Sequence, residues 1–227
     1  MKKLIIALSF FSLFQLSVKG QETVKTPAEK QAEYTKMISL RSDKIVDKLN
    51  IMEAGKAKLV SGMIAAHYSE LNDIYSKRDD AKKNSKALSA PNKPSEDAMK
   101  KIEEKVAFSV DSLHPIFLKQ LATQLNEKQV IQIKDGLTYS VLPLTYNAYL
   151  EELPDLKENQ KAQLMTWLVE AREHAMDEES SEKKHAWFGK FKGRINNYLS
   201  KEGYDMKKAG EEWQKRIKLK TPLQNKN

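Results

Sequence analysis

The segment from His185 to Leu199 combines aromatic, cationic and carboxamide side chains more densely than any other part of the sequence. At helical spacing, an apolar stripe separates from a second face that carries an indole, two cations and a carboxamide. The stripe is Phe188, Phe191, Ile195 and Leu199, and the second face is Trp187, Lys190, Arg194 and Asn197. An indole beside guanidinium and amide groups can stack on a sugar while those groups bind hydroxyls or a carboxylate. The pattern indicates a helix with one core side and one candidate binding side.

A second candidate group lies on the preceding helix, where Glu170, His174 and Asp177 are spaced i, i+4 and i+7. A carboxylate–imidazole–carboxylate row can hold a divalent cation or supply acid–base groups. The same row is also typical of a solvated helix face with local ion pairs. A zinc site would need a further imidazole, such as His185, so we expect no metal and no cofactor. His67 and His114 stand singly near apolar helix faces and are interpreted as structural.

An antiparallel hairpin turning near residues 177–181 would bring the two helices together and place Trp187 near Arg172. The alternative is that Trp187 anchors the hairpin while Arg172 and Arg194 pair with Glu173 and other acids. The irregular segment around Pro143 adds two tyrosines that can reach a ligand or lie buried with satisfied hydroxyls. The candidate ligand-binding residues are therefore Tyr139, Tyr146, Arg172, Glu173, His185, Trp187, Arg194, Asn196 and Asn197.

Two glycines, Gly189 and Gly193, lie one turn apart within this helix. Together they lower helix stability by roughly 2 kcal/mol relative to alanine, so some contact should offset that loss. Close packing against another helix is the expected reason, and close approach of a ligand to the backbone is the alternative.

The elements that position these residues are all predicted to be α-helices, because no stretch shows the alternation of a half-buried strand. Ser95, Asn126, Asp155 and Ser180 are predicted N-caps, and Gly203 a left-handed C-cap. Pro115 should kink or restart its helix, and Pro143 should break the segment 139–149. The expected helices span about 28–49, 53–79, 96–112, 127–139, 156–178, 181–202 and 206–218. We predict one compact all-α domain over residues 21–219, with a hairpin over 156–201, a flexible loop over 82–95 and a loose tail over 220–227.

The first twenty residues resemble a secretory signal peptide, with a basic start, an apolar run from Leu4 to Leu16 and a predicted cleavage before Gln21. We therefore expect a periplasmic or secreted protein without a transmembrane segment after cleavage. The chain has no cysteine, which excludes disulfides, thiolate nucleophiles and attachment of lipid through cysteine. Its net charge of +8 is spread among Lys/Glu pairs, so we expect no nucleic-acid partner.

Several segments also resemble a family of exported bacterial proteins, a domain of unknown function described as sugar-binding. The most specific match is Lys184–Leu199, and the region from Arg41 to Asp80, with His67-Tyr68 and Leu71-Asn72, also fits. Further matches are Lys134–Tyr139, Leu144–Tyr146 with Tyr149, Leu168–Asp177, Ser180-Ser181 and Gly203–Asp205. The resemblance implies one compact helical domain associated with carbohydrate, and it transfers no catalytic residue.

The leading hypothesis is therefore an exported protein that binds an oligosaccharide or polysaccharide, or another small polar ligand. A helical periplasmic chaperone or stress adaptor is the alternative. A third hypothesis is a carbohydrate-active enzyme that uses Glu170, Glu173 or Asp177 with His185. The sequence leaves the ligand, the oligomeric state and the choice between periplasm and exterior open.

Overall fold

The computed structural model describes residues 25–89 and 95–224, with side chains up to residue 219, and every regular element in these ranges is helical. The predicted all-α class is confirmed. The elements are α1 (Pro27–Val46), a short 3₁₀ turn (Asp47–Leu49), α2 (Ala54–Leu88), α3 (Glu96–Ala122), α4 (Glu127–Leu137), α5 (Val141–Glu152), α6 (Glu158–Met176), α7 (Ser181–Lys201) and α8 (Met206–Gln224). The predicted signal peptide lies outside the described residues. No described helix is both long and apolar enough to cross a membrane.

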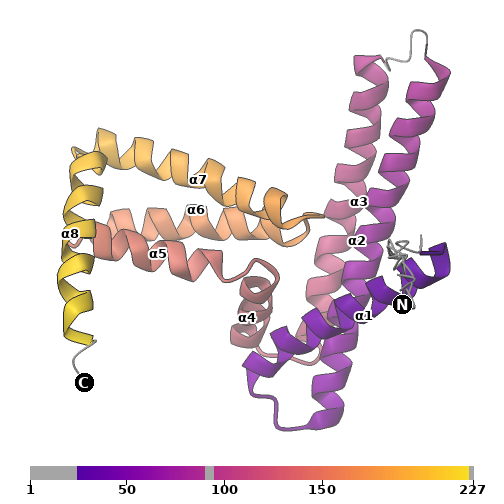
Figure 1. The fold of residues 1–227 in the computed structure, drawn as a ribbon, viewed down its shortest axis with the longest axis horizontal. Helices are drawn as coiled ribbons and strands as arrows, with labels where there is room; N and C mark the ends of the chain where they lie inside the picture. The colour runs from indigo at the N-terminus through magenta and orange to yellow at the C-terminus, as the bar shows by residue number, and fades with distance from the viewer. Residues whose placement is uncertain (1–24, 90–94, 225–227) are drawn as a thin grey trace, which may run out of the picture.

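The helices form two halves that meet near the end of α6 (Figure 1). In the first half, α2 and α3 form a long hairpin that α1 crosses, and α4 leads away from it. In the second half, α5, α6 and α7 run side by side, and α8 lies across their far end. Each half has its own apolar core, and Met176, the last residue of α6, belongs to the core of the first half. The end of α6 therefore joins the two halves.

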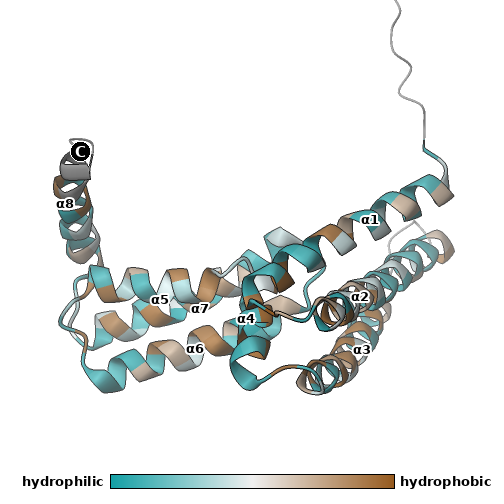
Figure 2. Ribbon diagram, turned by 90° about the horizontal axis from the view of Figure 1, so that it is seen from below, coloured by the Kyte–Doolittle hydropathy of each residue, from teal (hydrophilic) through white to brown (hydrophobic). Residues whose placement is uncertain are grey.

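The apolar stripe predicted on α7 is confirmed, because its four members are buried to 4% exposure or less. Hydrophobic and hydrophilic positions are interspersed along the helices of the second half (Figure 2), and the buried apolar residues of α6 and α7 belong to one core. On α1, the residues Ile38, Ser42, Ile45 and Val46 are buried, whereas Met37 and Leu40 are exposed. α1 packs chiefly against α2, so only a narrow side of it is covered.

The structure confirms three predicted N-caps and corrects the fourth. Ser95, Asn126 and Ser180 accept hydrogen bonds from backbone amides of the first helical turn, and Gly203 has a left-handed φ of 96°. Asp155 is not a cap, because α6 begins only after Lys157, whose amide bonds to Gln160. The reason is tertiary, since Leu156 enters the second core before the helix starts.

The predicted loop over 82–95 is shorter than expected, because α2 continues to Leu88 and an ion pair joins Lys82 to Glu103 on α3. Residues 90–94 lie outside the described residues.

α3 runs continuously through Pro115. α5 includes Pro143 in its first turn, where a backbone N–H has no helical partner to lose. The bend lies instead at Tyr139 and Ser140, both with a left-handed φ of 57°. α8 extends past the predicted end at residue 218 to Gln224.

Candidate functional site

The predicted ligand residues do not converge on one pocket, because α7 presents two polar flanks. Adjacent residues on a helix point about 100° apart, so Asn196 and Asn197 face different sides. Asn197 lines a groove beside α6, whereas Asn196 lines a groove beside α5. Arg172 and Glu173 belong to a third place, the junction of the two halves. Three separate environments therefore have to be considered.

The first environment is the α6–α7 face, which we define by Trp167, Trp187, Lys190, Arg194, Asn197 and Tyr198. The Arg194 guanidinium lies 4.6 Å from the centre of the Trp167 ring, and the Lys190 ammonium lies 4.8 Å from the centre of the Trp187 ring. Trp167 also contacts Tyr198 edge to face, with the ring centres 5.3 Å apart. Aromatic rings and cations thus alternate along about three turns of the hairpin.

A shallow groove of about 590 Å³ opens along this face. Its lining residues are Trp167, Lys190, Gly193, Arg194, Asn197, Tyr198 and Lys201. A side chain added at Gly189 or Gly193 would meet nothing within 4 Å, so the predicted close helix packing at these glycines is wrong. The carboxamide of Asn197 makes no hydrogen bond within the described chain. The groove therefore offers open backbone and free polar groups.

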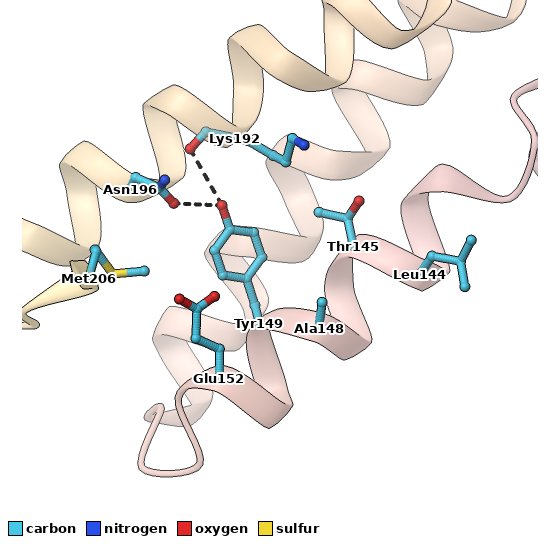
Figure 3. Close-up of a pocket in the computed structure, with 8 residues that line it drawn as sticks. All are labelled: Leu144, Thr145, Ala148, Tyr149, Glu152, Lys192, Asn196 and Met206. Carbon is cyan, nitrogen blue, oxygen red and sulfur yellow. Dashed lines mark hydrogen bonds between the residues drawn. The ribbon is translucent and has the colours of Figure 1, made fainter. Parts of the chain in front are cut away.

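The second environment is the α5–α7 groove, with a volume of about 450 Å³ (Figure 3). It is lined by Leu144, Thr145, Ala148, Tyr149, Glu152, Lys192, Asn196 and Met206. The Tyr149 hydroxyl donates a hydrogen bond of 2.6 Å to the Asn196 carboxamide oxygen and joins the two helices. Burial, together with the charge of Glu152, raises the pKa of Tyr149 above its usual range. Tyr149 therefore lines the groove as a neutral phenol that is hydrogen-bonded to α7.

Three other predicted residues lie apart from both grooves. Tyr139 is half exposed and stacks on His185, with the ring centres 5.6 Å apart. The His185 Nδ1 atom lies 2.7 Å from the backbone oxygen of Ser181. Tyr146 packs, partly buried, against the core of the second half. The structure does not bring Tyr146 together with Trp187.

The third environment is the junction, which centres on the buried carboxylate of Asp177 directly after α6. Asp177 Oδ1 lies 2.8 Å from His67 Nε2 on α2, and Oδ2 lies 2.5 Å from His114 Nδ1 on α3. The Tyr75 hydroxyl donates a hydrogen bond to the Asp177 backbone oxygen. One residue of the second half is thus held by two helices of the first half.

Glu173, which is partly exposed, belongs to the junction through its ion pairs. Its carboxylate lies 2.6 Å from Lys134 Nζ and 3.5 Å from His114 Nε2. Burial alone would raise the pKa of Glu173, but the hydrogen bonds from His114 and Lys134 lower it to about 2. Hydrogen bonds to Asp177 and Glu173 raise the pKa of His114 to about 9 despite partial burial. At neutral pH this cluster therefore contains a charged imidazolium between two carboxylates.

A buried cation, Lys184, completes the junction from the first turn of α7. Its ammonium donates hydrogen bonds to the backbone oxygens of Leu137 and Met176, the last residues of α4 and α6. Carbonyl groups at helix C-termini carry partial negative charge and favour a cation. Burial nevertheless lowers the pKa of Lys184 to about 8. This lysine joins three helices at one point.

These contacts correct several predicted groupings. Trp187 does not approach Arg172. Its ring stacks on His174 at 4.4 Å, and its Nε1 atom donates to Glu178. Arg172 is buried and bonds to Asp135 and Glu173, in agreement with the structural alternative.

The predicted row of Glu170, His174 and Asp177 also divides. Glu170 faces Arg194, His174 faces Trp187, and Asp177 turns into the junction. His185 contacts neither Glu173 nor Asp177. Asp177 is instead contacted by His67 and His114, and Glu173 by His114. Within the described residues, no group of three or more histidines and acids could hold a metal ion.

Sequence reasoning thus missed the pairing of His67 and His114 around Asp177. More than 40 residues separate each member from the next along the chain, so no local spacing connects them. The resemblance that included His67-Tyr68 and Leu168–Asp177 was the one available signal, and it contained no information on contact.

The chain belongs to the family described as "Protein of unknown function (DUF3826)", whose model matches residues 35–219. No curated protein matches the sequence. The matched range contains the two grooves and the junction, and the predicted membership of an uncharacterised family is confirmed. The family description names no activity, so the function has to be argued from geometry and chemistry.

Proposed function

We propose that this protein is an exported carbohydrate-binding protein and that the α6–α7 face is its binding surface. The observation that carries the proposal is the groove in which Trp167 and Tyr198 alternate with Lys190, Arg194 and Asn197. Aromatic rings provide apolar surfaces for the C–H-rich faces of sugars, and a few placed polar groups provide orientation. Trp187 extends the same row by one further ring.

The charge of α7 supports an acidic sugar chain as the ligand class. The helix carries six cations and one acid, the cations being Lys183, Lys184, Lys190, Lys192, Arg194 and Lys201. Lys190 and Lys201 form no ion pair within the described chain, and Arg194 lies 3.6 Å from Glu170 at an exposed position. A guanidinium at such a position can exchange a weak surface partner for a uronate carboxylate.

The shape of the groove supports a chain rather than a single sugar. From Lys190 to Lys201 the helix rises by about 16 Å, and the groove is shallow along this length. Gly189 and Gly193 leave the backbone of α7 accessible on the side away from the core. A polysaccharide segment can therefore lie along the hairpin without displacing a side chain.

Calorimetric titration of acidic and neutral oligosaccharides tests the proposal. We expect oligogalacturonate to bind, and we expect Trp187→Ala and Arg194→Gln each to weaken binding at least about tenfold, or about 1.4 kcal/mol. Lys192→Gln, on the other flank of α7, is the matched control and should keep the affinity. Undiminished binding in both face variants, or no binding of any sugar, would contradict the proposed site. Circular dichroism verifies that each variant folds.

A further inference from the structure

The α5–α7 groove contains a carboxylate, that of Glu152, to which none of the described residues donates a hydrogen bond. Its side chain accepts no hydrogen bond within the described chain, although the backbone oxygen of the same residue accepts one from Arg216. Burial raises the pKa of Glu152, an effect that the charge of Arg216 opposes. A partly desolvated carboxylate is stabilised by a hydrogen-bonding cation, and the described residues supply none at these two oxygens.

An ammonium group stands at the other end of the same groove, on Lys192. It forms no ion pair within the described residues, and Figure 3 places it on the side of the Tyr149 ring where Thr145 lies. The Glu152 carboxylate lies on the other side of that ring, toward Met206. The groove thus has one negative end and one positive end.

The separation of the two ends limits the ligand. α5 and α7 both run from the junction toward α8, so Thr145 and Glu152 mark positions along the groove. Seven residues of helix correspond to a rise of about 10 Å. An extended peptide gains about 3.3–3.6 Å per residue, so the charged termini of a tripeptide reach about the same distance. A single α-amino acid is too short to contact both ends.

Between the ends, the groove offers complementary groups for a peptide backbone and small side chains. The Asn196 carboxamide oxygen is occupied by Tyr149, which leaves its NH₂ group free to donate. Leu144, Ala148 and Met206 provide apolar surface. A volume of about 450 Å³ lies within the range of small-molecule sites.

We infer that the α5–α7 groove binds a short unblocked peptide of two or three residues. The peptide's terminal ammonium bonds to Glu152, its terminal carboxylate bonds to Lys192, and its amide carbonyl accepts a hydrogen bond from Asn196. This site lies on the flank of α7 opposite the proposed sugar surface and does not depend on that proposal.

Trialanine, its N-acetylated form and its C-terminal amide are the probes, measured by calorimetric titration against the protein. We expect trialanine to bind and each blocked form to bind at least about tenfold more weakly. Glu152→Gln should weaken binding of trialanine and remove the penalty of acetylation. Lys192→Gln should do the same for the penalty of amidation.

Matched controls separate this inference from the proposed function. Lys190→Gln and Trp187→Ala, both on the α6–α7 face, should leave trialanine binding unchanged. The inference is overturned if trialanine does not bind at millimolar concentration, or if blocking either terminus has no effect. It is also overturned if Lys190→Gln weakens binding as much as Lys192→Gln. Neither the Glu152 carboxylate nor the Lys192 ammonium forms a hydrogen bond or an ion pair within the described chain, so both variants should fold, as circular dichroism can verify.

Discussion

The junction around Asp177 and the α6–α7 face use the same kinds of side chain for opposite purposes. The junction contains histidines, acids and basic residues, and the basic and aromatic residues of the face contact an acid and a histidine of α6, Glu170 and His174. At the junction, the Asp177 side chain is 5% exposed and each of its carboxylate oxygens contacts a histidine. On the face, the Arg194 side chain is 54% exposed and lies 3.6 Å from a half-exposed Glu170. Burial and pairing of both Asp177 oxygens make the first region a structural contact between the two halves, whereas exposure and weak pairing of Arg194 leave the second available to a ligand.

The largest expected change in stability follows from removing the carboxylate at the centre of the junction. Asp177→Ala leaves His67 and His114 in place without their shared carboxylate, and breaking a buried charge pair costs about 3–5 kcal/mol. We expect a decrease of that order in the free energy of unfolding, measured by urea titration. Glu170→Ala, on the exposed face of α6, is the control and should change stability by less than about 1 kcal/mol. Equal losses in the two variants would remove the distinction between the regions.

The next effect is the pH dependence of stability. His114 has a pKa of about 9 in the folded protein, above the ordinary 6.5, so the folded state binds the extra proton between these values. Its stabilising contribution is complete below about pH 6.5 and is lost as the pH rises through about 9, with a change on the order of 3 kcal/mol. Lys184 acts in the opposite direction, because its pKa falls from 10.5 to about 8, and deprotonation relieves the cost of burying its charge.

Urea titrations across this pH range check the expected curve. Stability should fall between about pH 6.5 and 8, and the fall should weaken above pH 8 as Lys184 begins to oppose it. His114→Asn should flatten the decline below pH 8. A decline that persists in this variant would show that another group controls it. Replacing the exposed His185 by Asn is the control and should leave the curve unchanged.

The contrast also explains what could be predicted from the sequence. Periodicity and capping chemistry are local, and they correctly gave the buried stripe of α7 and the caps at Ser95, Asn126 and Ser180. The start of α6 was wrong because burial of Leu156, a tertiary contact, overrides the local signal at Asp155. Tertiary contacts also decide whether an acidic side chain is buried and paired or exposed to solvent. Glu170 lies on α6 and Asp177 directly follows that helix at the same helical spacing, and the approach of α2 and α3 separates their roles.

A smaller effect is expected at the glycines of the open face. Gly193→Ala adds a methyl group that meets nothing within 4 Å, so it should stabilise the helix by about 0.5–1 kcal/mol. Gly193 also lines the proposed sugar groove, so the same methyl group should weaken oligogalacturonate binding. Gly189→Ala is the control, because Gly189 is equally open but does not line that groove. If both variants gain stability and keep full affinity, the backbone of α7 does not contact the ligand.

The smallest expected effect tests whether the face is free. A double-mutant cycle on Glu170 and Arg194 measures how strongly the pair stabilises the unliganded protein, using Glu170→Ala, Arg194→Ala and their combination. Both side chains are about half exposed and their charged atoms are 3.6 Å apart, so the coupling should be about 0.5 kcal/mol or less. A weak pair means that a ligand carboxylate can take over Arg194 at little cost. A coupling above about 1 kcal/mol would instead make Arg194 part of the hairpin's own structure. The α6–α7 face would then be structural like the junction at Asp177, and the sugar-binding site would have to lie elsewhere.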